Sequence, residues 1–202
     1  MQQIQDIGKT LASTRKIQLV FISGLAQSGK TTSASYMMNS ILLKYNSPIL
    51  TCSIYPLAFP IKEIAYRDFS WDGKKDEKGR KLLQIIGTDA GRAYNENIWV
   101  SKLEDRITEN LMPPNFVFID DWRFPNEADW FENKFLYDIT RIRIDRKVET
   151  SSVYEHESEK SLPDKNDKYY YDFYIENNGT IEELYRKLDD VLAYLETKII
   201  FR

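Results

Sequence analysis

The residues with the clearest chemical purpose lie in the stretch GLAQSGKT, which runs from Gly24 to Thr31. The stretch fits the pattern G-x4-G-K-[ST], in which glycines let successive backbone N–H groups turn inward and hold phosphate oxygens. Lys30 is expected to reach the β- and γ-phosphates of a nucleotide, and the Thr31 hydroxyl to ligate Mg²⁺. The apolar run 17–22 precedes the loop and a helix-compatible segment follows it, which favours a phosphate-binding P-loop over a flexible Gly-Ser loop.

Two acids follow the next strongly apolar run, Phe116–Ile119. A buried strand that ends in Asp120 and Asp121 is typical of a Walker B strand, whose carboxylate lies near the metal of a P-loop protein. The alternative interpretation is a buried strand that ends in a solvated Asp-Asp turn.

The elements that must position these groups alternate between strand and helix patterns. Helices are predicted over 31–44, 61–66, 97–111 and 182–198, the last opened by the capping box Thr180-x-x-Glu183. A further short helix is predicted to be opened by the segment 122–127 and to run through residue 131. Strands are predicted over 17–22, 49–55, 116–119, 139–146 and 172–177, and 49–55 is apolar enough for the interior of the sheet. The charged segment 71–81 indicates a mobile loop, and 149–168 a lid or surface loop. The order predicts a three-layer α/β fold with a parallel sheet and right-handed crossovers.

Composition limits the remaining function classes. A chain of 202 residues with 42% hydrophobic content suits one domain, 1–202, with insertions for closure. A net charge of −3 argues against a general nucleic-acid or membrane-surface role. The single cysteine, Cys52, suits a reducing compartment, and the N-terminal residues lack the apolar region of a signal peptide. We therefore expect a cytoplasmic protein.

In order after the P-loop, the segments GRKLLQIIGTDAGR, ENIWV, FIDDWRFPNEA, HESE and YIENNGTIEEL make the chain resemble the phage-type deoxynucleoside monophosphate kinases. The resemblance covers nearly everything from Ile17 to Leu195. It implies a P-loop kinase fold with a monophosphate-binding insertion at about 60–95 and a lid at about 146–168. It also implies transfer of the γ-phosphoryl group of ATP to a deoxynucleoside 5′-monophosphate, in host cytoplasm if the protein is phage-encoded, and a tendency to form homodimers.

The resemblance also implies a set of site residues. Contacts with Mg-ATP are expected from Gly24, Ala26, Gln27, Ser28, Gly29, Lys30, Thr31 and Thr32, and from Asn178, Gly179 and Thr180 before the last helix. The acceptor site is expected to use Arg80, Gln84, Thr88, Asp89, Arg92 and Arg123. Beyond the resemblance, Trp99 and Arg143 are further candidates for binding the acceptor. Thr31, Asp120 and Asp121 are the expected metal ligands; the family more often has an aliphatic residue at Asp121, which favours Asp120.

The chemistry of this reaction agrees with the residues present. The attacking group is a phosphate monoester whose second pKa is about 6, so it needs no general base at neutral pH, and a chain with one histidine suffices. Catalysis then rests on positioning and on neutralising charge, for which Lys30, Asp120, Arg123 and Arg146 are the candidate catalytic residues. Each arginine has an alternative role in a salt bridge or at a helix end, and Trp99 also fits the buried stripe of its helix.

Two other functions remain open at this point. Dephospho-coenzyme A kinase shares the P-loop and a terminal strand-Asn-Gly-helix, so a different acceptor is one alternative. A non-catalytic nucleotide-binding regulator is the other, although a regulator needs no second phosphate site such as the one expected at Arg80–Arg92.

Overall fold

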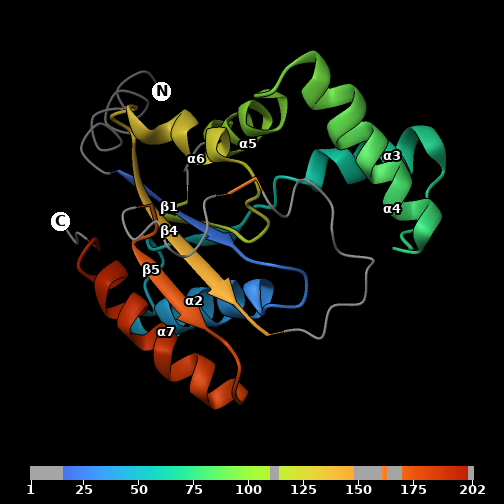
Figure 1. Cartoon of the computed structure of the whole chain (residues 1–202). Coiled ribbons are helices and arrows are strands. Elements are labelled where there is room, and N and C mark those ends of the chain that lie inside the picture. The colour runs from blue at the N-terminus through green and yellow to red at the C-terminus, as the bar shows by residue number, and fades with distance from the viewer. Residues whose placement is uncertain (1–15, 110–113, 148–160, 163–169, 200–202) are drawn as a thin grey trace, which may run out of the picture.

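The computed structural model of the protein describes residues 16–109, 114–147, 161–162 and 170–199. Within them one sheet of five strands has the order β2-β3-β1-β4-β5, and every neighbouring pair is parallel (Figure 1). The strands are β1 (Ile17–Ser23), β2 (Cys52–Ile54), β3 (Phe116–Ile119), β4 (Tyr137–Asp145) and β5 (Phe173–Glu176). The predicted parallel α/β architecture is thereby confirmed.

Helices cover both faces of the sheet, as the alternation of side chains along β1 requires. Val20 and Ile22 point to the face covered by α2 (Lys30–Tyr45) and α7 (Ile181–Glu196). Leu19 and Phe21 point to the opposite face, where α5 (Ile98–Thr108) and α6 (Pro125–Glu132) pack (Figure 1). Each face therefore has its own apolar core, and the molecule has three layers.

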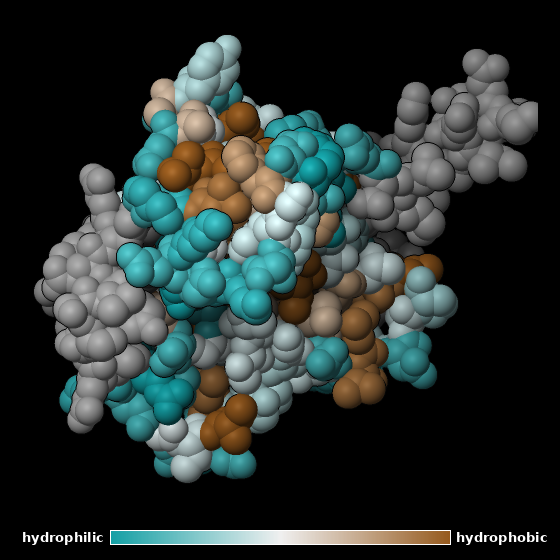
Figure 2. Space-filling view, turned by 90° about the vertical axis from the view of Figure 1, so that its right-hand side faces the viewer, coloured by the Kyte–Doolittle hydropathy of each residue, from teal (hydrophilic) through white to brown (hydrophobic). Residues whose placement is uncertain are grey.

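A third apolar cluster lies outside these layers, between α3 (Phe59–Phe69), α4 (Glu77–Gln84) and the π-helix η1 (Ile85–Arg92). Its buried members are Ala65, Trp71, Ile86 and Trp99. Figure 1 shows this α3–α4 region at the right of the molecule, set apart from α2 and α7. On the surface of that side, separate apolar patches alternate with polar residues (Figure 2).

The strand order places a topological switch point at β1. From β1 the chain goes to one side to form β2 and β3, then returns to the other side to form β4 and β5. In open parallel sheets a crevice forms at the carboxyl ends of the strands where the direction reverses, and ligands bind there. The loop that follows β1 occupies this position.

Two predictions about local structure were wrong. The predicted interior strand 49–55 is the short edge strand β2, and Ile49 is 52% exposed. The apolar character of the segment 49–55 is explained instead by Leu50, which is buried beside α2. The segment 71–81 is not a loop throughout, because Asp76 accepts a hydrogen bond from the N–H of Gly79 and starts α4 at Glu77.

The remaining elements lie close to their predicted positions. The capping box of α7 is present, since the Thr180 hydroxyl accepts from the N–H of Glu183. The predicted lid lies almost entirely outside the described residues, as does residue 111 of the predicted stripe on α5. In the described part of the chain no helix combines the length and the apolar composition that crossing a bilayer requires.

Candidate active site

The loop between β1 and α2 has backbone geometry that only glycine tolerates easily. Gly24 has φ 144° and Gly29 has φ 102°. A Cβ on Gly24 would lie 2.1 Å from the carbonyl oxygen of Ile144, and one on Gly29 would lie 2.7 Å from Nδ2 of Asn177. Gly29 is also the N-cap of α2 and has no side chain to cap it, so the first N–H groups of the helix remain available for an anion.

Two side chains of the P-loop make specific hydrogen bonds. The Nζ atom of Lys30 donates to the carbonyl oxygens of Gly24 and Leu25, each at 2.7 Å, so the lysine lies along the loop. Oγ1 of Thr31 donates to Oδ2 of Asp120 at 2.6 Å. This contact brings the P-loop threonine and the first acid after β3 together, although 89 residues separate them.

The two acids after β3 have different environments. Asp120 is 8% exposed and faces Thr31. Both oxygens of Asp121 accept backbone hydrogen bonds, from Leu57 at 2.8 Å and Ala58 at 2.9 Å. Burial raises the pKa of Asp121, although these bonds act in the opposite direction. Asp121 therefore anchors the chain before α3, and Asp120 is the acid that faces Thr31.

The turn before α7 lies against the P-loop. Nδ2 of Asn177 donates to the carbonyl oxygen of Ser28 at 2.9 Å, and Oδ1 of Asn178 accepts from the N–H of Lys147. Asn178, Gly179 and Thr180 are exposed, and Thr180 caps α7. The predicted ATP-binding residues at this turn and in the loop, including Ala26, Gln27 and Thr32, thus belong to one corner of the molecule.

Arg92, at the end of η1, contacts an aromatic ring, an amide and a carboxylate. Its guanidinium lies 3.7 Å from the ring centroid of Phe124, Nη2 donates to Oδ1 of Asn126 at 2.8 Å, and Nη1 is 3.2 Å from Oε1 of Glu127. The Arg92 side chain is only 14% exposed. The predicted acceptor-site arginine therefore lies directly beside the turn that follows Asp121.

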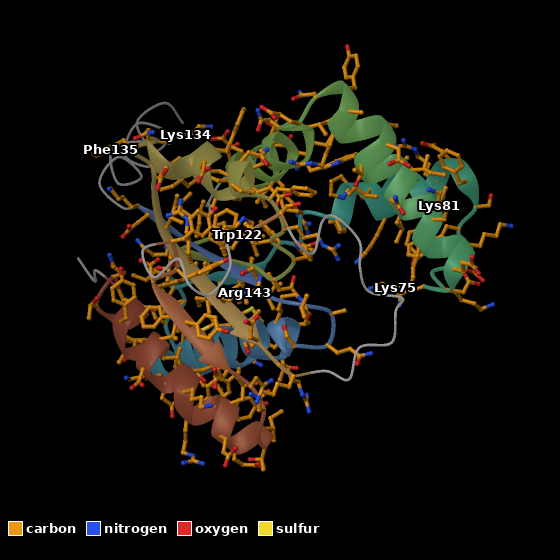
Figure 3. All side chains as sticks on the ribbon, in the orientation of Figure 1. Lys75, Lys81, Trp122, Lys134, Phe135 and Arg143 are labelled. Carbon is orange, nitrogen blue, oxygen red and sulfur yellow. The ribbon has the colours of Figure 1, made fainter. Side chains whose placement is uncertain are left out.

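More cations gather near Arg123, the exposed residue that follows this turn. Burial lowers the pKa of Lys75, and the positive charges of Lys62, Arg80 and Arg123 lower it further, whereas the charge of Asp121 acts in the opposite direction. Nε of Arg80 donates to the carbonyl oxygen of Lys75 at 2.8 Å. Figure 3 shows Lys75 at the edge of the α3–α4 region nearer the P-loop. Four like charges from three segments thus lie close together, which favours an anion at this place.

Arg143 and Arg146 come from β4 and the residues after it. Arg143 pairs in register with Ser23 of β1, directly before the P-loop, and its Nε lies 2.7 Å from Oδ1 of Asp145 (Figure 3). Its side chain is 14% exposed, whereas Arg146 is exposed. Both lie at the carboxyl edge of the sheet.

The other predicted acceptor residues divide into two groups. Gln84 and Thr88 are half-buried along α4 and η1, and exposed Asp89 lies 3.8 Å from Nζ of Lys81. Trp99 is 4% exposed, and its Nε1 donates to the carbonyl oxygen of Gly87 at 2.7 Å. Because Trp99 packs in the third core, the expectation that it binds substrate is corrected.

Sequence reasoning missed Glu127 and the lysines at 62 and 75. Glu127 stands three residues after the N-cap Phe124 of α6, which is the spacing of a capping box and the one available signal. Lys62 lies in the predicted helix 61–66, and Lys75 lies in the charged segment 71–81 that is predicted as a loop. The electrostatic influence of Lys62 and Arg123 on Lys75 joins distant parts of the chain, which residue types alone do not reveal.

Comparison with known proteins assigns the chain to a family. The sequence model described as deoxynucleotide monophosphate kinase matches residues 66–188. A protein of Acanthamoeba polyphaga mimivirus, provisionally named a deoxynucleotide monophosphate kinase, is 30% identical over 190 residues, which cover 84% of this chain and 93% of that protein. The chain belongs to the deoxynucleotide monophosphate kinase family. It is therefore a nucleotide kinase rather than a non-catalytic regulator.

Further similarities are more partial. The deoxynucleoside-5′-monophosphate kinase of Escherichia phage T5 is 33% identical over 92 residues, 43% of this chain and 35% of that protein. Among solved structures, the Mycobacterium tuberculosis APS kinase CysC in complex with AMPPNP and APS aligns with a TM-score of 0.49 at 12% identity. A mutant of the same kinase aligns with a TM-score of 0.48 at 14% identity. Each alignment covers 89% of this chain and 99% of the kinase.

Proposed function

We propose that the protein transfers the γ-phosphoryl group of ATP to a deoxynucleoside 5′-monophosphate, giving the deoxynucleoside diphosphate and ADP. The observation that carries the proposal is the contact between Thr31 and Asp120, which joins the P-loop to the acid after β3 in a chain of this kinase family. A P-loop kinase needs this pairing because the hydroxyl and the carboxylate hold the metal of the donor nucleotide.

The donor side of the site fits Mg-ATP. Thr31 and Asp120 offer hard oxygen atoms, the donor type that Mg²⁺ prefers, and Mg²⁺ usually shares its remaining positions between water and substrate phosphates. When bound, the ion would neutralise charge on the β- and γ-phosphates. Lys30 moves from the loop carbonyl groups to the same phosphates, and the N–H groups at the start of α2 hold their oxygens.

The acceptor side is proposed to lie between the α3–α4 region and the turn after β3. Arg123, Arg80 and Lys75 present positive charge there, and Arg92 adds a guanidinium from the end of η1. The acceptor phosphate is mostly a dianion at neutral pH and attacks without a general base. The cations hold it in line with the γ-phosphate and balance the charge of the two substrates.

The domain organisation belongs to the same proposal. Residues 1–202 form one kinase domain, in which about 60–95 is the acceptor-binding insertion and about 146–168 the lid that carries Arg146. The insertion contains most of the third apolar cluster, so it has an apolar core separate from the two cores on the faces of the sheet. Homodimer formation remains part of the proposal, as implied by the resemblance.

A coupled assay of ADP release tests the proposal directly. The purified chain is given ATP with Mg²⁺ and each of the four deoxynucleoside monophosphates, with their ribose counterparts and dephospho-coenzyme A as further acceptors. The proposal predicts turnover with at least one deoxynucleotide and loss of turnover with EDTA. No activity above ATP hydrolysis with any deoxynucleotide would refute it.

A further inference from the structure

Glu127 is a buried carboxylate beside the site that the proposed phosphoryl transfer does not use. It is 4% exposed, and each of its oxygens has a different kind of partner. Oε1 lies 3.2 Å from Nη1 of Arg92, whereas Oε2 accepts from the backbone N–H groups of Arg123 at 2.9 Å and Phe124 at 3.0 Å. One side chain therefore binds both predicted acceptor arginines, one through its guanidinium and the other through its backbone.

These partners come from two separate parts of the chain. Arg92 ends η1 in the proposed acceptor-binding insertion, and Arg123 belongs to the turn that follows the Walker B strand. Asn126 strengthens the same connection, because its Oδ1 accepts from Arg92 and its Nδ2 donates to Oδ1 of Asn97 at 2.8 Å. The insertion is thus tied to the Walker B turn by a small polar network under the Phe124 ring.

A purely structural role does not account for the charge of Glu127. The cap of α6 needs an oxygen acceptor, and the amide of glutamine would supply one. Burial raises the pKa of Glu127 to about 7, although the two backbone bonds and Arg92 act in the opposite direction; the charge of Asp121 adds to the rise. Ionised Glu127 therefore costs stability, and the cation that its charge faces is Arg92, whose Nη1 lies 3.2 Å from Oε1.

We propose that Glu127 is a positioning residue that fixes the guanidinium of Arg92 relative to Arg123 and so sets the spacing of two cations around the acceptor phosphate. The inference rests on the proposed function. Each Nη of Arg92 carries two hydrogens, so the contacts with Asn126 and Glu127 leave donors for a phosphate oxygen. A bidentate contact is sensitive to direction, which is why an oriented guanidinium binds phosphate better than a mobile one.

A double-mutant cycle tests this role. Initial rates are measured for the parent, Glu127→Gln, Arg92→Ala and the double variant, with the deoxynucleotide that the parent turns over best. Glu127→Gln should raise the KM for the deoxynucleotide about tenfold, because Arg92 loses its fixed direction, and leave the KM for ATP within about twofold. In the Arg92→Ala background the same change should have no further effect, since Glu127 acts through Arg92. Arg92→Lys serves as the background if Arg92→Ala does not fold.

Glu104→Gln is the matched control, because Glu104 is a half-buried glutamate bound by Lys134 and Trp130 away from the site. It should leave the KM for the deoxynucleotide unchanged. The inference is overturned if Glu127→Gln leaves that KM unchanged, or if the effects of Glu127→Gln and Arg92→Ala multiply. If the parent turns over no deoxynucleotide, the proposed function is refuted, and the inference is refuted with it. If the parent turns over a deoxynucleotide but Glu127→Gln leaves the KM unchanged, only the inference is refuted.

Discussion

Thr31 and Asp120 meet across the carboxyl edge of the sheet, where Oγ1 of Thr31 donates to Oδ2 of Asp120 at 2.6 Å. The pairing of β1 with β3 brings them together, since Phe21 is in register with Ile119, the residue before Asp120. The next acid, Asp121, turns to the opposite side of the chain and binds the backbone of Leu57 and Ala58. The two adjacent carboxylates therefore have different hydrogen-bond partners.

Asp120→Asn and Asp121→Asn are expected to differ in what they impair. Asp120→Asn should sharply raise the Mg²⁺ concentration needed for half-maximal activity, because it removes the charge of the proposed metal ligand. Asp121→Asn should leave the Mg²⁺ requirement nearly unchanged but lower the free energy of unfolding by about 1–3 kcal/mol, since its amide cannot accept both backbone hydrogen bonds. Mg²⁺ titrations of activity and urea unfolding separate the two effects. A Mg²⁺ requirement that neither change alters would contradict the Walker B assignment.

Lys30→Ala should lower kcat by about 10²-fold or more, as expected when a contact made in the transition state is lost. Lys44→Ala on the same helix is the control, because Lys44 is exposed and pairs with Glu196 on α7. Steady-state kinetics and thermal melts of both variants test the prediction. Near-parental turnover by a folded Lys30→Ala variant would show that the loop does not hold the donor phosphates.

The central layers of this fold could be predicted from the sequence because their signals are local. An apolar run before a glycine-rich loop predicted β1, and the capping box at Thr180 located the start of α7 within a residue. The edge strand β2 was misplaced because Leu50 is apolar for packing beside α2, outside the strand. Local composition cannot distinguish that kind of burial from the interior of a sheet.

Only those parts of the candidate site that belong to a short sequence motif could be predicted from the sequence. Sequence motifs identified the P-loop and the two acids. They did not predict that Asp120 and Asp121 have different partners, because the partners of Asp121 are backbone groups more than 60 residues away. Trp99 is a candidate for substrate binding in the sequence but also fits the buried stripe of its helix, and Gly91 leaves room for its ring to pack in the third core. Lys75 and Glu127 act through contacts between distant segments, which no spacing rule encodes.

Lys75→Met should raise the KM for the deoxynucleotide about tenfold and change the KM for ATP little, because it removes one charge-assisted contact with the acceptor phosphate. Methionine keeps the length of the side chain, and the hydrogen bond from Arg80 to the carbonyl oxygen of residue 75 is retained. Lys81→Met is the control, since Lys81 lies on α4, the helix that begins two residues after Lys75, and its Nζ is 3.8 Å from Asp89.

The lowered pKa of Lys75 provides a second measurement that does not depend on activity. A larger fraction of its amine is neutral near pH 8, so an acetylating reagent should modify Lys75 faster than Lys81. The deoxynucleotide should protect Lys75 from the reagent. Equal labelling of the two lysines, without protection by the deoxynucleotide, would place the acceptor phosphate elsewhere.

The buried carboxylate of Glu127 should give the protein a distinctive dependence of stability on pH. Its pKa is about 7 in the folded chain and 4.5 in the unfolded chain, so between these values the folded state binds more protons. The free energy of unfolding of the parent should therefore fall as pH rises through this range, and Glu127→Gln should remove that fall. Between pH 5 and pH 8 the parent should lose about 1–3 kcal/mol relative to Glu127→Gln.

Glu104 provides the opposite case in the same molecule. Although burial acts to raise it, hydrogen bonds from Lys134 and Trp130 hold the pKa of Glu104 below its ordinary value. A lowered carboxylate pKa contributes stability above the unfolded value of 4.5, and that contribution is lost only as pH falls through the folded pKa. Urea unfolding at pH 5.5, 6.5, 7.5 and 8 should therefore show a nearly constant difference between the parent and Glu104→Gln, but a changing one for Glu127→Gln. A constant difference for Glu127→Gln would mean that Glu127 stays ionised across this range and that its burial carries no cost.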